Sequence, residues 1–391
     1  KFEVLSFGGA VNHKDYTPQN PDGYEGRWQI FPIDGYGDPP KLRAVVNDWK
    51  PDIVYFMTDP RFYGWLWSMA HEIRDKVPLV YYHVWDNKPY PTFNKPFYDS
   101  NDFIATISKV TSDIVQVVSP DVPEKYIPHA VDSEIFKPAT TASEKIKCAE
   151  WKTNIPHLKT ESGDDKLIFF WNNRNARRQQ SGTLLYWWKD FLDIVGHDKA
   201  ILIMHTDVND QHGQPLDYII SSLGIDQGQV MFSTKKLPSD ALSNFYKIAD
   251  CTINVSDAEG FGLATLESLS CETPIIVTMT GGLQEQVTDG ENWFGIGIEP
   301  ASKSIIGSQQ VPWIYEDRIS GKDFVDSLVK FYKMDKKDRD NLGKMGREHV
   351  LKNYNFKDFN KTWVDTMLNL HERCGSWENR KNYQSWELIE L

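Results

Sequence analysis

Short, continuously apolar runs alternate with longer amphipathic stretches along most of the chain. The short runs are rich in β-branched and aromatic residues, as strands are, and the longer ones repeat their apolar positions at a helical period. Such alternation is typical of βαβ units that build a parallel sheet. We therefore expect strands at 2–7, 28–33, 53–57, 79–82 and 103–106, and a second series at 166–171, 200–205, 229–232, 251–255 and 274–278.

Helices are expected between these strands, at 41–49, 62–75, 110–118, 181–194, 216–223, 239–248 and 264–270. A polar stretch at 139–165 has little strand signal and is interpreted as a linker. From 322 to 391 the pattern is that of almost continuous polar helix. The predicted fold class is α/β, with two doubly wound, Rossmann-like domains. We place them at 1–155 and 156–371, followed by a helix at 372–391 that crosses back to the first domain.

The composition of the chain fits two domains and narrows the classes of partner. The chain has 391 residues, and its 43 Lys and Arg are outnumbered by 55 Asp and Glu, which disfavours general binding to nucleic acid. The four cysteines form no CxxC pair or Cys/His cluster, so neither a zinc site nor a disulfide framework is indicated. No apolar stretch approaches the roughly 18 residues of a transmembrane segment. The start, KFEVLSFGGA, predicts a strand and not a signal peptide, so we expect a cytoplasmic protein.

The densest group of chemically capable residues lies in the segment 249–287, ADCTINVSDAEGFGLATLESLSCETPIIVTMTGGLQEQV. Gly260 and Gly262 allow backbone N–H groups to approach an anion, and the helix that begins near Leu263 directs its positive end to the same place. Glu259 and Glu267 offer carboxylates to sugar hydroxyls. Two glutamates eight residues apart are weak evidence alone, because helical glutamates are commonly solvated surface groups.

The order of these residues resembles the retaining GT-B glycosyltransferases of the sucrose-synthase and mannosyltransferase type, the glycosyl transferases group 1. That family has a Glu, then Gly-Phe-Gly, a second Glu after seven intervening residues, a strand and Gly-Gly. Here these are Glu259, residues 260–262, Glu267 and residues 281–282. The segment IPHAVDSEIFKP at 127–138 also resembles the end of the family's first domain, although His-Ala replaces its usual Asn-Gly. The resemblance implies a GT-B architecture, with a cleft between the two domains and a helical tail.

An arginine-rich turn at the start of the second domain offers charge for phosphate binding. Arg174, Arg177 and Arg178 lie between a strand and a helix, and guanidinium groups suit phosphate oxygens by charge and geometry. In the family, an Arg and a Lys five residues later hold the nucleotide diphosphate. Arg174 matches the first, but Gln179 occupies the Lys position, so either Arg178 supplies the second charge or the leaving group is stabilised less. The alternative is a basic cluster on the surface.

His83 follows the strand at 79–82, beside aromatic residues. A lone histidine there is most often hydrogen-bonded in the core. The resemblance, however, places a histidine after this strand against the donor sugar, and that match favours an active-site role. Gly8 and Gly9 match a glycine turn at which the donor or acceptor approaches the backbone. The implied catalytic residues are Glu259, His83, Arg174 and Arg178, and the implied donor-binding residues are Gly8, Gly9, Gln179, Gly260, Phe261, Gly262, Leu263, Thr265 and Glu267.

The resemblance implies a retaining transferase that needs no metal or other cofactor and moves a hexose to an acceptor hydroxyl. GDP-mannose is the first donor we expect, with UDP-hexoses behind it, and the acceptor is a glycan, a lipid or a small molecule. The Asp-x-Asp motif at 338–340 lies in a Lys- and Asp-rich helical run, where a solvated face is the better interpretation. Two alternatives stay open: a degenerate, carbohydrate-binding protein, and a phosphorylase or epimerase of the same fold.

Overall fold

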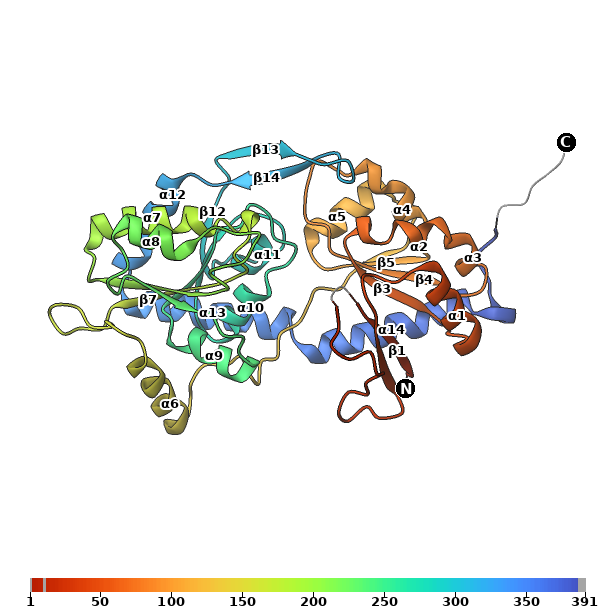
Figure 1. Cartoon of the computed structure of the whole chain (residues 1–391), viewed down its shortest axis with the longest axis horizontal. Helices are drawn as coiled ribbons and strands as arrows, with labels where there is room; N and C mark the ends of the chain where they lie inside the picture. Colours follow the sequence, from red (N-terminus) through yellow and green to blue (C-terminus); the bar gives the residue numbers. More distant parts are fainter. Residues whose placement is uncertain (1, 10–11, 386–391) are drawn as a thin grey trace.

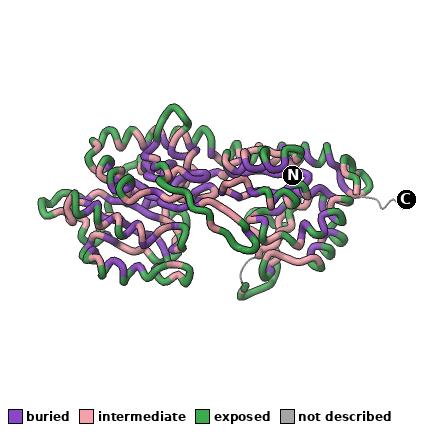
Figure 2. The backbone as a smooth tube through the Cα atoms, turned by 90° about the horizontal axis from the view of Figure 1, so that it is seen from above, coloured by how far each residue is buried: buried purple, intermediate pink, exposed green. Residues whose placement is uncertain are grey.

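The computed structural model describes residues 2–9 and 12–385. Two α/β domains lie side by side, each with strands inside and helices outside (Figure 1). The sheet of the first domain has the strand order β3-β4-β5-β6, and the sheet of the second has β12-β11-β10-β7-β8-β9. Every neighbouring pair in both sheets is parallel. Buried residues concentrate in the central strands of both halves (Figure 2), and the predicted α/β class is confirmed.

The first domain contains the predicted strands, with ends that differ by at most two residues, and one additional short strand. Its sheet consists of β3 (Val54–Thr58), β4 (Leu79–His83), β5 (Phe103–Thr106) and the unpredicted β6 (Glu124–Tyr126). β1 (Val4–Gly8) and β2 (Trp28–Pro32) form a separate parallel pair. The helices are α1 (Pro39–Trp49), α2 (Gly64–Ser68), α3 (Ala70–Arg74), α4 (Lys95–Asp99) and α5 (Lys109–Val118), with short 3₁₀ turns at Pro60–Phe62 and Thr92–Asn94.

The helix predicted at 62–75 is broken into a 3₁₀ turn and the short helices α2 and α3. Gly64 and the aromatic residues around it have low helix propensity. Trp67 stacks on Phe97 with ring centroids 4.8 Å apart, and it also contacts Phe56 and Tyr81 edge to face. Tertiary packing of aromatic rings therefore overrides the helical period of this stretch.

The second domain carries all five strands predicted for it, again with ends that differ by at most one residue. They are β7 (Leu167–Asn172), β8 (Ala200–His205), β9 (Val230–Ser233), β10 (Cys251–Asn254) and β11 (Ile275–Thr278), to which the structure adds β12 (Gly295–Ile298). Its helices are α7 (Ser181–Val195), α8 (Leu216–Leu223), α9 (Ser239–Ile248), α10 (Leu263–Ser270), α11 (Leu283–Val287) and α12 (Gly321–Lys333). Because all strands are parallel, their carboxyl ends meet at one edge of the sheet, and that edge faces the first domain.

Two segments that lack a strong sequence pattern are ordered. The predicted linker contains α6 (Ala142–Thr153), which begins with a capping box between Thr141 and Glu144. None of the residues of α6 is fully buried, so its pattern lacks an apolar face. β13 (Ser302–Ile306) and β14 (Ile314–Arg318) form an antiparallel hairpin outside both parallel sheets. This hairpin, residues 302–318, spans from the second domain to the first at the top of Figure 1 and is called the strap below.

The predicted continuous helix at 322–391 is divided into α12, α13 (Lys336–Asn353) and α14 (Phe356–Cys374), followed by a 3₁₀ turn at Trp377–Asn379. The break before α14 lies at Asn355, whose side chain caps the new helix. α14 returns to the first domain, where Trp363 contacts the rings of Tyr55 and Tyr82 edge to face. The return crossing therefore runs through α14, and in place of the helix predicted at 372–391 the chain leaves α14 at Cys374; residues 386–391 lie outside the described part.

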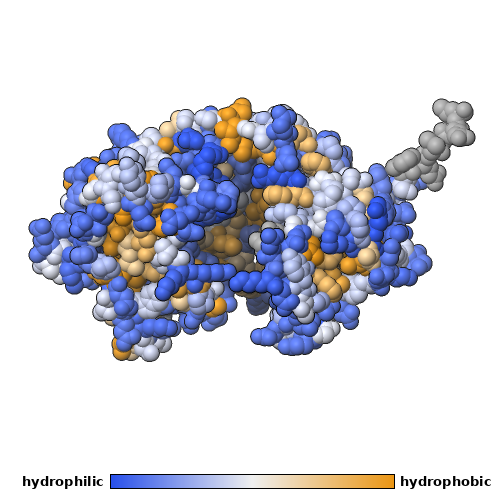
Figure 3. Space-filling model, in the orientation of Figure 1, coloured by the Kyte–Doolittle hydropathy of each residue, from blue (hydrophilic) through white to orange (hydrophobic). Residues whose placement is uncertain are grey.

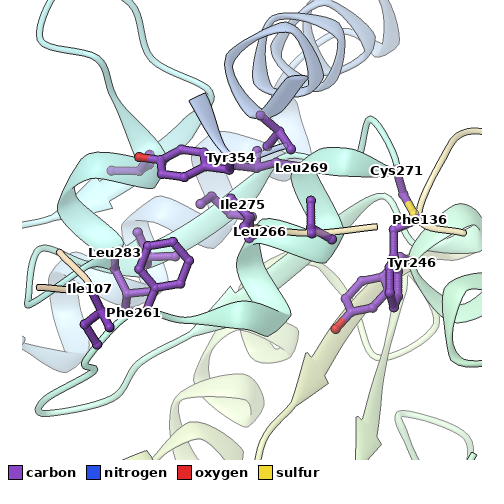
Figure 4. Close-up of a cluster of buried hydrophobic side chains, with 14 of the residues drawn as sticks. Ile107, Phe136, Tyr246, Phe261, Leu266, Leu269, Cys271, Ile275, Leu283 and Tyr354 are labelled. Atoms are coloured by element: carbon purple, nitrogen blue, oxygen red, sulfur yellow. The ribbon is translucent and has the colours of Figure 1, made fainter. Parts of the chain in front are cut away.

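One hydrophobic cluster continues from the first domain into the second, which ties the loops of the site to the core. Figure 4 shows Ile107 and Phe136 of the first domain among side chains of the second, including Phe261 and Leu283. None of the helices in the described residues is long and apolar enough to cross a membrane.

Candidate functional site

The loop between β10 and α10 is held by close backbone packing that only glycines allow. Gly262 has φ of 92° and precedes the first turn of α10, which has no side-chain cap. A Cβ on Gly281 would lie 1.8 Å from the carbonyl oxygen of Glu259, and one on Gly282 would lie 2.6 Å from Cα of Phe261. The Gly-Gly turn after β11 therefore packs directly on the backbone of residues 259–261, and the amide of Gly282 donates to Glu259 O at 3.1 Å.

Phe261 and Thr265 fix this loop from the inside. The Phe261 ring is 3% exposed and contacts His129 and Tyr354 edge to face. Figure 4 shows Phe261 among the buried side chains of this cluster. The hydroxyl of Thr265 donates to Gln286 at 2.7 Å, and the amide of Gln286 donates to Phe261 O at 2.7 Å. Of the predicted donor-binding residues, these two thus direct their side chains into the core. Leu263, by contrast, is 49% exposed on the first turn of α10.

Glu259 lies within reach of the arginine-rich turn, as the sequence predicts. Its Oε2 is 3.3 Å from Nε2 of Gln179 and 3.5 Å from a guanidinium nitrogen of Arg178. Arg178 also donates to Ala258 O, and Gln179 accepts from the hydroxyl of Ser256. Gln179 is buried, at 4% exposure, so the residue in the family's Lys position is part of a closed polar network.

Arg174 lies apart from that network, on the exposed side of the same turn. Its Nε donates to Asp210 at 2.5 Å, and its Nη2 donates to Nδ1 of His212 at 2.8 Å. The hydrogen bond from Arg174, together with those that His212 makes to Asp210, holds the pKa of Asp210 well below its usual range. The structure therefore brings Arg178 and Gln179 to Glu259, and it places Arg174 at the neighbouring loop after β8.

Glu267 projects from the middle of α10 toward β7. Its Oε2 accepts the hydroxyl of Tyr246 at 2.7 Å, and that hydroxyl accepts the side-chain amide of Asn172 at 2.8 Å. Burial raises the pKa of Glu267 to about 7, against which the Tyr246 hydrogen bond acts only in part. The carboxyl group therefore titrates near neutral pH.

His83 is enclosed in the core of the first domain, with 0% exposure. The Tyr81 hydroxyl donates to Thr58 O at 2.6 Å, so it accepts Nδ1–H of His83 at 2.9 Å. Nε2 in turn accepts the Tyr98 hydroxyl at 2.7 Å. Burial lowers the pKa of His83 to about 3, which keeps the ring neutral. Both ring nitrogens are occupied, so this geometry favours the structural role over the predicted contact with a donor sugar.

Gly8 ends β1 beside β2, and Gly9, the next residue, packs against the loop after β2. A Cβ on Gly9 would lie 2.3 Å from the carbonyl oxygen of Gly35, so the turn requires glycine there. The carbonyl oxygen of Gly8 accepts Nε2 of His13 at 2.7 Å. These contacts lie within the first domain, and they do not extend to Glu259.

Asp86 is a site residue that the sequence analysis missed. It is half-buried in the loop after β4, and a Cβ on Gly260 would lie 3.8 Å from its Oδ2. Burial raises the pKa of Asp86 to about 7, although the nearby charge of Arg178 lowers it. The first domain therefore contributes a carboxyl group to the place where Arg178 and Glu259 meet. An acidic residue just beyond the carboxyl end of a strand was the available signal.

Figure 3 shows the molecular surface hollowed between the two domains. Two cavities lie elsewhere, of about 920 Å³ beneath α6 at the amino ends of β7 to β9, and of about 590 Å³ beside α13. Their linings include none of the predicted site residues. Among residues 2–9 and 12–385, no three His, Cys, Asp or Glu side chains gather closely enough to hold a metal ion. That the activity requires no metal stays a prediction.

Comparison with known proteins relates one part of this chain to a known family. Residues 191–349, which include β10, α10 and the Gly-Gly turn, match the family model described as glycosyl transferases group 1. This part of the chain, less than half of its length, resembles a group 1 glycosyltransferase domain. It includes Glu259 and Glu267, whereas the arginine-rich turn and the first domain lie before the matched residues.

A curated relative agrees with that match, and solved structures show the fold. A D-inositol 3-phosphate glycosyltransferase of Acidothermus cellulolyticus is 44% identical over 66 residues, which is 17% of this chain and 15% of the relative. Sucrose-phosphate synthase of Thermosynechococcus elongatus superimposes with a TM-score of 0.73 at 16% identity, covering 95% of this chain and 89% of that one. Anabaena HepE in complex with UDP-glucose gives 0.69 at 12% identity, covering 94% and 100%. The chain therefore has a GT-B fold, as predicted. The roles of individual residues stay predictions.

Proposed function

We propose that this protein is a retaining glycosyltransferase that moves a hexose from a nucleotide-diphosphate donor to an acceptor hydroxyl. The observation that carries the proposal is the position of Glu259. It lies between the arginine-rich turn and the uncapped amino end of α10, within a segment of the group 1 glycosyltransferase family. A carboxylate that contacts the sugar and a helix end that binds phosphate would then lie side by side.

The difficult step is departure of a diphosphate that gains negative charge. The N–H groups of the first turn of α10 have no side-chain partner, and they present the positive end of the helix to such a group. Arg178 adds a guanidinium beside Glu259. Fixed donors that face developing charge are commonly the largest contribution to this kind of catalysis. In this proposal they act without a divalent ion.

The remaining polar groups are assigned to the sugar, the ribose and the acceptor. Glu259 would accept hydroxyls of the transferred hexose, and Glu267, oriented by Tyr246, would accept those of the ribose. Asp86 approaches the same place from the first domain and is the candidate contact for the acceptor hydroxyl. Transfer with retention then proceeds on the face of the sugar that the diphosphate leaves, with the departing phosphate as the base.

The donor is either GDP-mannose, the first expectation from the sequence, or a UDP-hexose. UDP-glucose is bound in the Anabaena structure of the same fold, and this favours testing both bases on an equal footing. The acceptor could be a glycan, a lipid headgroup or a small molecule. The 66-residue match to an inositol phosphate glycosyltransferase makes an inositol phosphate a reasonable first acceptor to try.

The test begins with thermal shifts for GDP, UDP, GDP-mannose and UDP-glucose, each with and without EDTA. A ligand that binds the folded state raises the Tm according to its affinity and concentration. A shift by one base that EDTA does not reduce, together with radiolabelled transfer that Glu259→Ala abolishes, would support the proposal. Full transfer by Glu259→Ala would contradict the assigned role.

A non-catalytic, carbohydrate-binding protein is the second candidate, and Gln179 is the observation that favours it. The family's Lys is replaced by a neutral side chain that is already bonded to Ser256 and Glu259. Sugar binding with no response to any nucleotide would support this alternative. A phosphorylase of the same fold would carry pyridoxal phosphate, so an absorbance spectrum of the purified protein tests that reading.

A further inference from the structure

The strap is anchored at its tip in the first domain. Val311 is 7% exposed and belongs to the same hydrophobic cluster as Trp85 and Tyr98. Trp313 contacts the ring of Phe93 edge to face, with centroids 4.9 Å apart. Side chains from one domain thus complete the core of the other.

Backbone hydrogen bonds continue this attachment along β14. The amide of Tyr315 donates to Lys88 O at 2.6 Å, and the side chain of Asn87 donates to Tyr315 O at 2.9 Å. Lys88 and Asn87 directly follow Asp86, the first-domain carboxyl group of the site. The strap therefore bonds to the loop that carries Asp86.

The other end of β14 is bonded to the two loops of the second domain that form the site. Glu316 is 2% exposed and pairs with Arg177 of the arginine-rich turn and, at 2.7 Å, with Arg318. Arg318 also lies 3.5 Å from Asp257, and the amide of Asp317 donates to Asp257 O at 2.9 Å. The result is a cluster of two arginines and two acids beside Glu259.

The strap has little else to hold it in place. It consists of two five-residue strands that belong to neither sheet, and an isolated hairpin is marginally stable. Its outer face is exposed, with Ile305 at 61%, and an apolar patch is visible over it at the top of Figure 3. Its position is therefore set by the contacts with the loops of Asp86, Arg177 and Asp257.

We propose that the strap couples closure of the two domains to the arrangement of the donor site, and that Glu316 is a positioning residue. Glu316 draws Arg177 away from the phosphate region and fixes the turn from which Arg178 and Gln179 reach Glu259. The tip holds the first domain, with Asp86, against the same site. The role of Glu316 rests on the proposed transferase function, whereas the coupling of the domains does not.

The coupling is tested without any nucleotide, by small-angle X-ray scattering of the full chain. Two variants are used. Trp313→Ala removes one contact of the tip, and a double variant carries Val311→Ser in addition. Ile305→Ser is the matched control, because this side chain lies on the exposed face of the same hairpin. We expect a larger radius of gyration for the tip variants, at unchanged circular dichroism. The control should show no change in the radius. An unchanged radius for a folded tip variant would overturn the coupling.

The positioning role is tested by Glu316→Gln and Glu316→Asp. We expect Glu316→Gln to raise the donor KM at least tenfold with a smaller change in kcat, and Glu316→Asp to recover part of the loss. Glu299→Gln, at an exposed position, is the control. A donor KM within twofold of wild type would overturn the role. If the wild-type protein binds no nucleotide, the proposed function fails and the role of Glu316 fails with it, while the scattering result still decides the coupling.

Discussion

The carboxyl edges of the two sheets differ in where their polar side chains point. At the edge of the second sheet, Gln179, Ser256 and Glu259 bond to one another across the loops that follow β7 and β10. At the edge of the first sheet, His83 turns into the core and bonds to two tyrosines. The two edges have the same parallel topology, but the second brings three of its predicted residues, Arg178, Gln179 and Glu259, into one polar network.

Strand burial explains this difference. All five residues of β4 are buried, and alternate side chains lie on opposite faces, so His83 shares a face with Tyr81. Its ring is therefore inside the layer between the sheet and α4 before the chain reaches the edge. In the second domain the polar residues of the network lie in the turns beyond the strands, where glycines allow the loops to pack closely on one another. Position relative to the strand end, more than residue type, decides which side chains reach the cleft.

The largest expected effect is on Glu259, the centre of the second-domain network. We expect Glu259→Gln to reduce transfer by about 100- to 1,000-fold, because it removes a charge that faces the reacting sugar. Nucleotide binding, measured by thermal shift, should persist, since Arg178 and the end of α10 remain. Glu291→Gln, an exposed glutamate, is the control. Equal loss of nucleotide binding and transfer would place Glu259 at the nucleotide instead of the sugar.

The next effect is on stability and concerns His83. We expect His83→Ala to lower the free energy of unfolding by about 2–3 kcal/mol, because it opens a cavity and leaves the O–H of Tyr98 without its acceptor. Urea unfolding measures this loss, and the donor KM of the folded variant should change less than threefold. Tyr98→Phe is the companion variant, which removes the bond to Nε2 and the longer one from Asn94 but leaves the ring of His83 in place. A tenfold rise in donor KM at unchanged stability would restore the sugar-binding role that the resemblance implies.

Sequence alone predicts which strands and loops of the second domain lie together because the signals are local. The apolar runs of β10 and β11, the glycines at 260, 262, 281 and 282 and the two glutamates are close in the chain, and each has a direct backbone or charge consequence. The parallel strands at 200–205 and 103–106 are found without error for the same reason, since a fully buried strand is a continuous apolar run.

The parts that sequence misses depend on contacts between distant segments. β13 is almost wholly exposed, so it has no apolar alternation, and the strap is ordered only by what it meets in the first domain. Asp86 becomes a site residue because the domains bring it to Gly260, which is 174 positions further along the chain. The orientation of His83 depends likewise on Tyr98 from α4. Such long-range partners leave no period in the sequence.

A smaller effect concerns the pH dependence of stability. Burial raises the pKa of Glu267 to about 7 from a usual value of 4.5, so its contribution to stability is complete below pH 4.5 and is lost as pH rises through about 7. We expect Glu267→Gln to reduce the fall in unfolding free energy between pH 5 and pH 8, by on the order of 1–3 kcal/mol. Urea titrations at the two pH values measure it.

Burial also raises the pKa values of Asp86 and Asp257, which titrate in the same range and remain in the variant. The fall in unfolding free energy of the variant should therefore be smaller than that of the wild type, but it should not be zero. Glu299→Gln serves as the exposed control. The same experiment sharpens the functional assignment, because ribose hydroxyls prefer the carboxylate and nucleotide affinity should therefore increase from pH 6 to pH 8. An identical pH profile of stability in Glu267→Gln would show that this carboxyl group is not buried in solution.

The smallest effect concerns Arg174. Its variants distinguish a role as phosphate ligand from that of a simple surface charge. Arg174 is exposed and bonded to Asp210, and exposed ion pairs contribute at most about 1 kcal/mol. If Arg174 reaches the diphosphate only after leaving Asp210, Arg174→Gln should raise the donor KM about three- to fivefold, and Asp210→Asn should lower it by a similar factor. The two variants change opposite members of one ion pair, so opposite shifts indicate a phosphate contact. A KM unchanged in both would assign Arg174 to the surface and leave Arg178 as the arginine that acts at this edge.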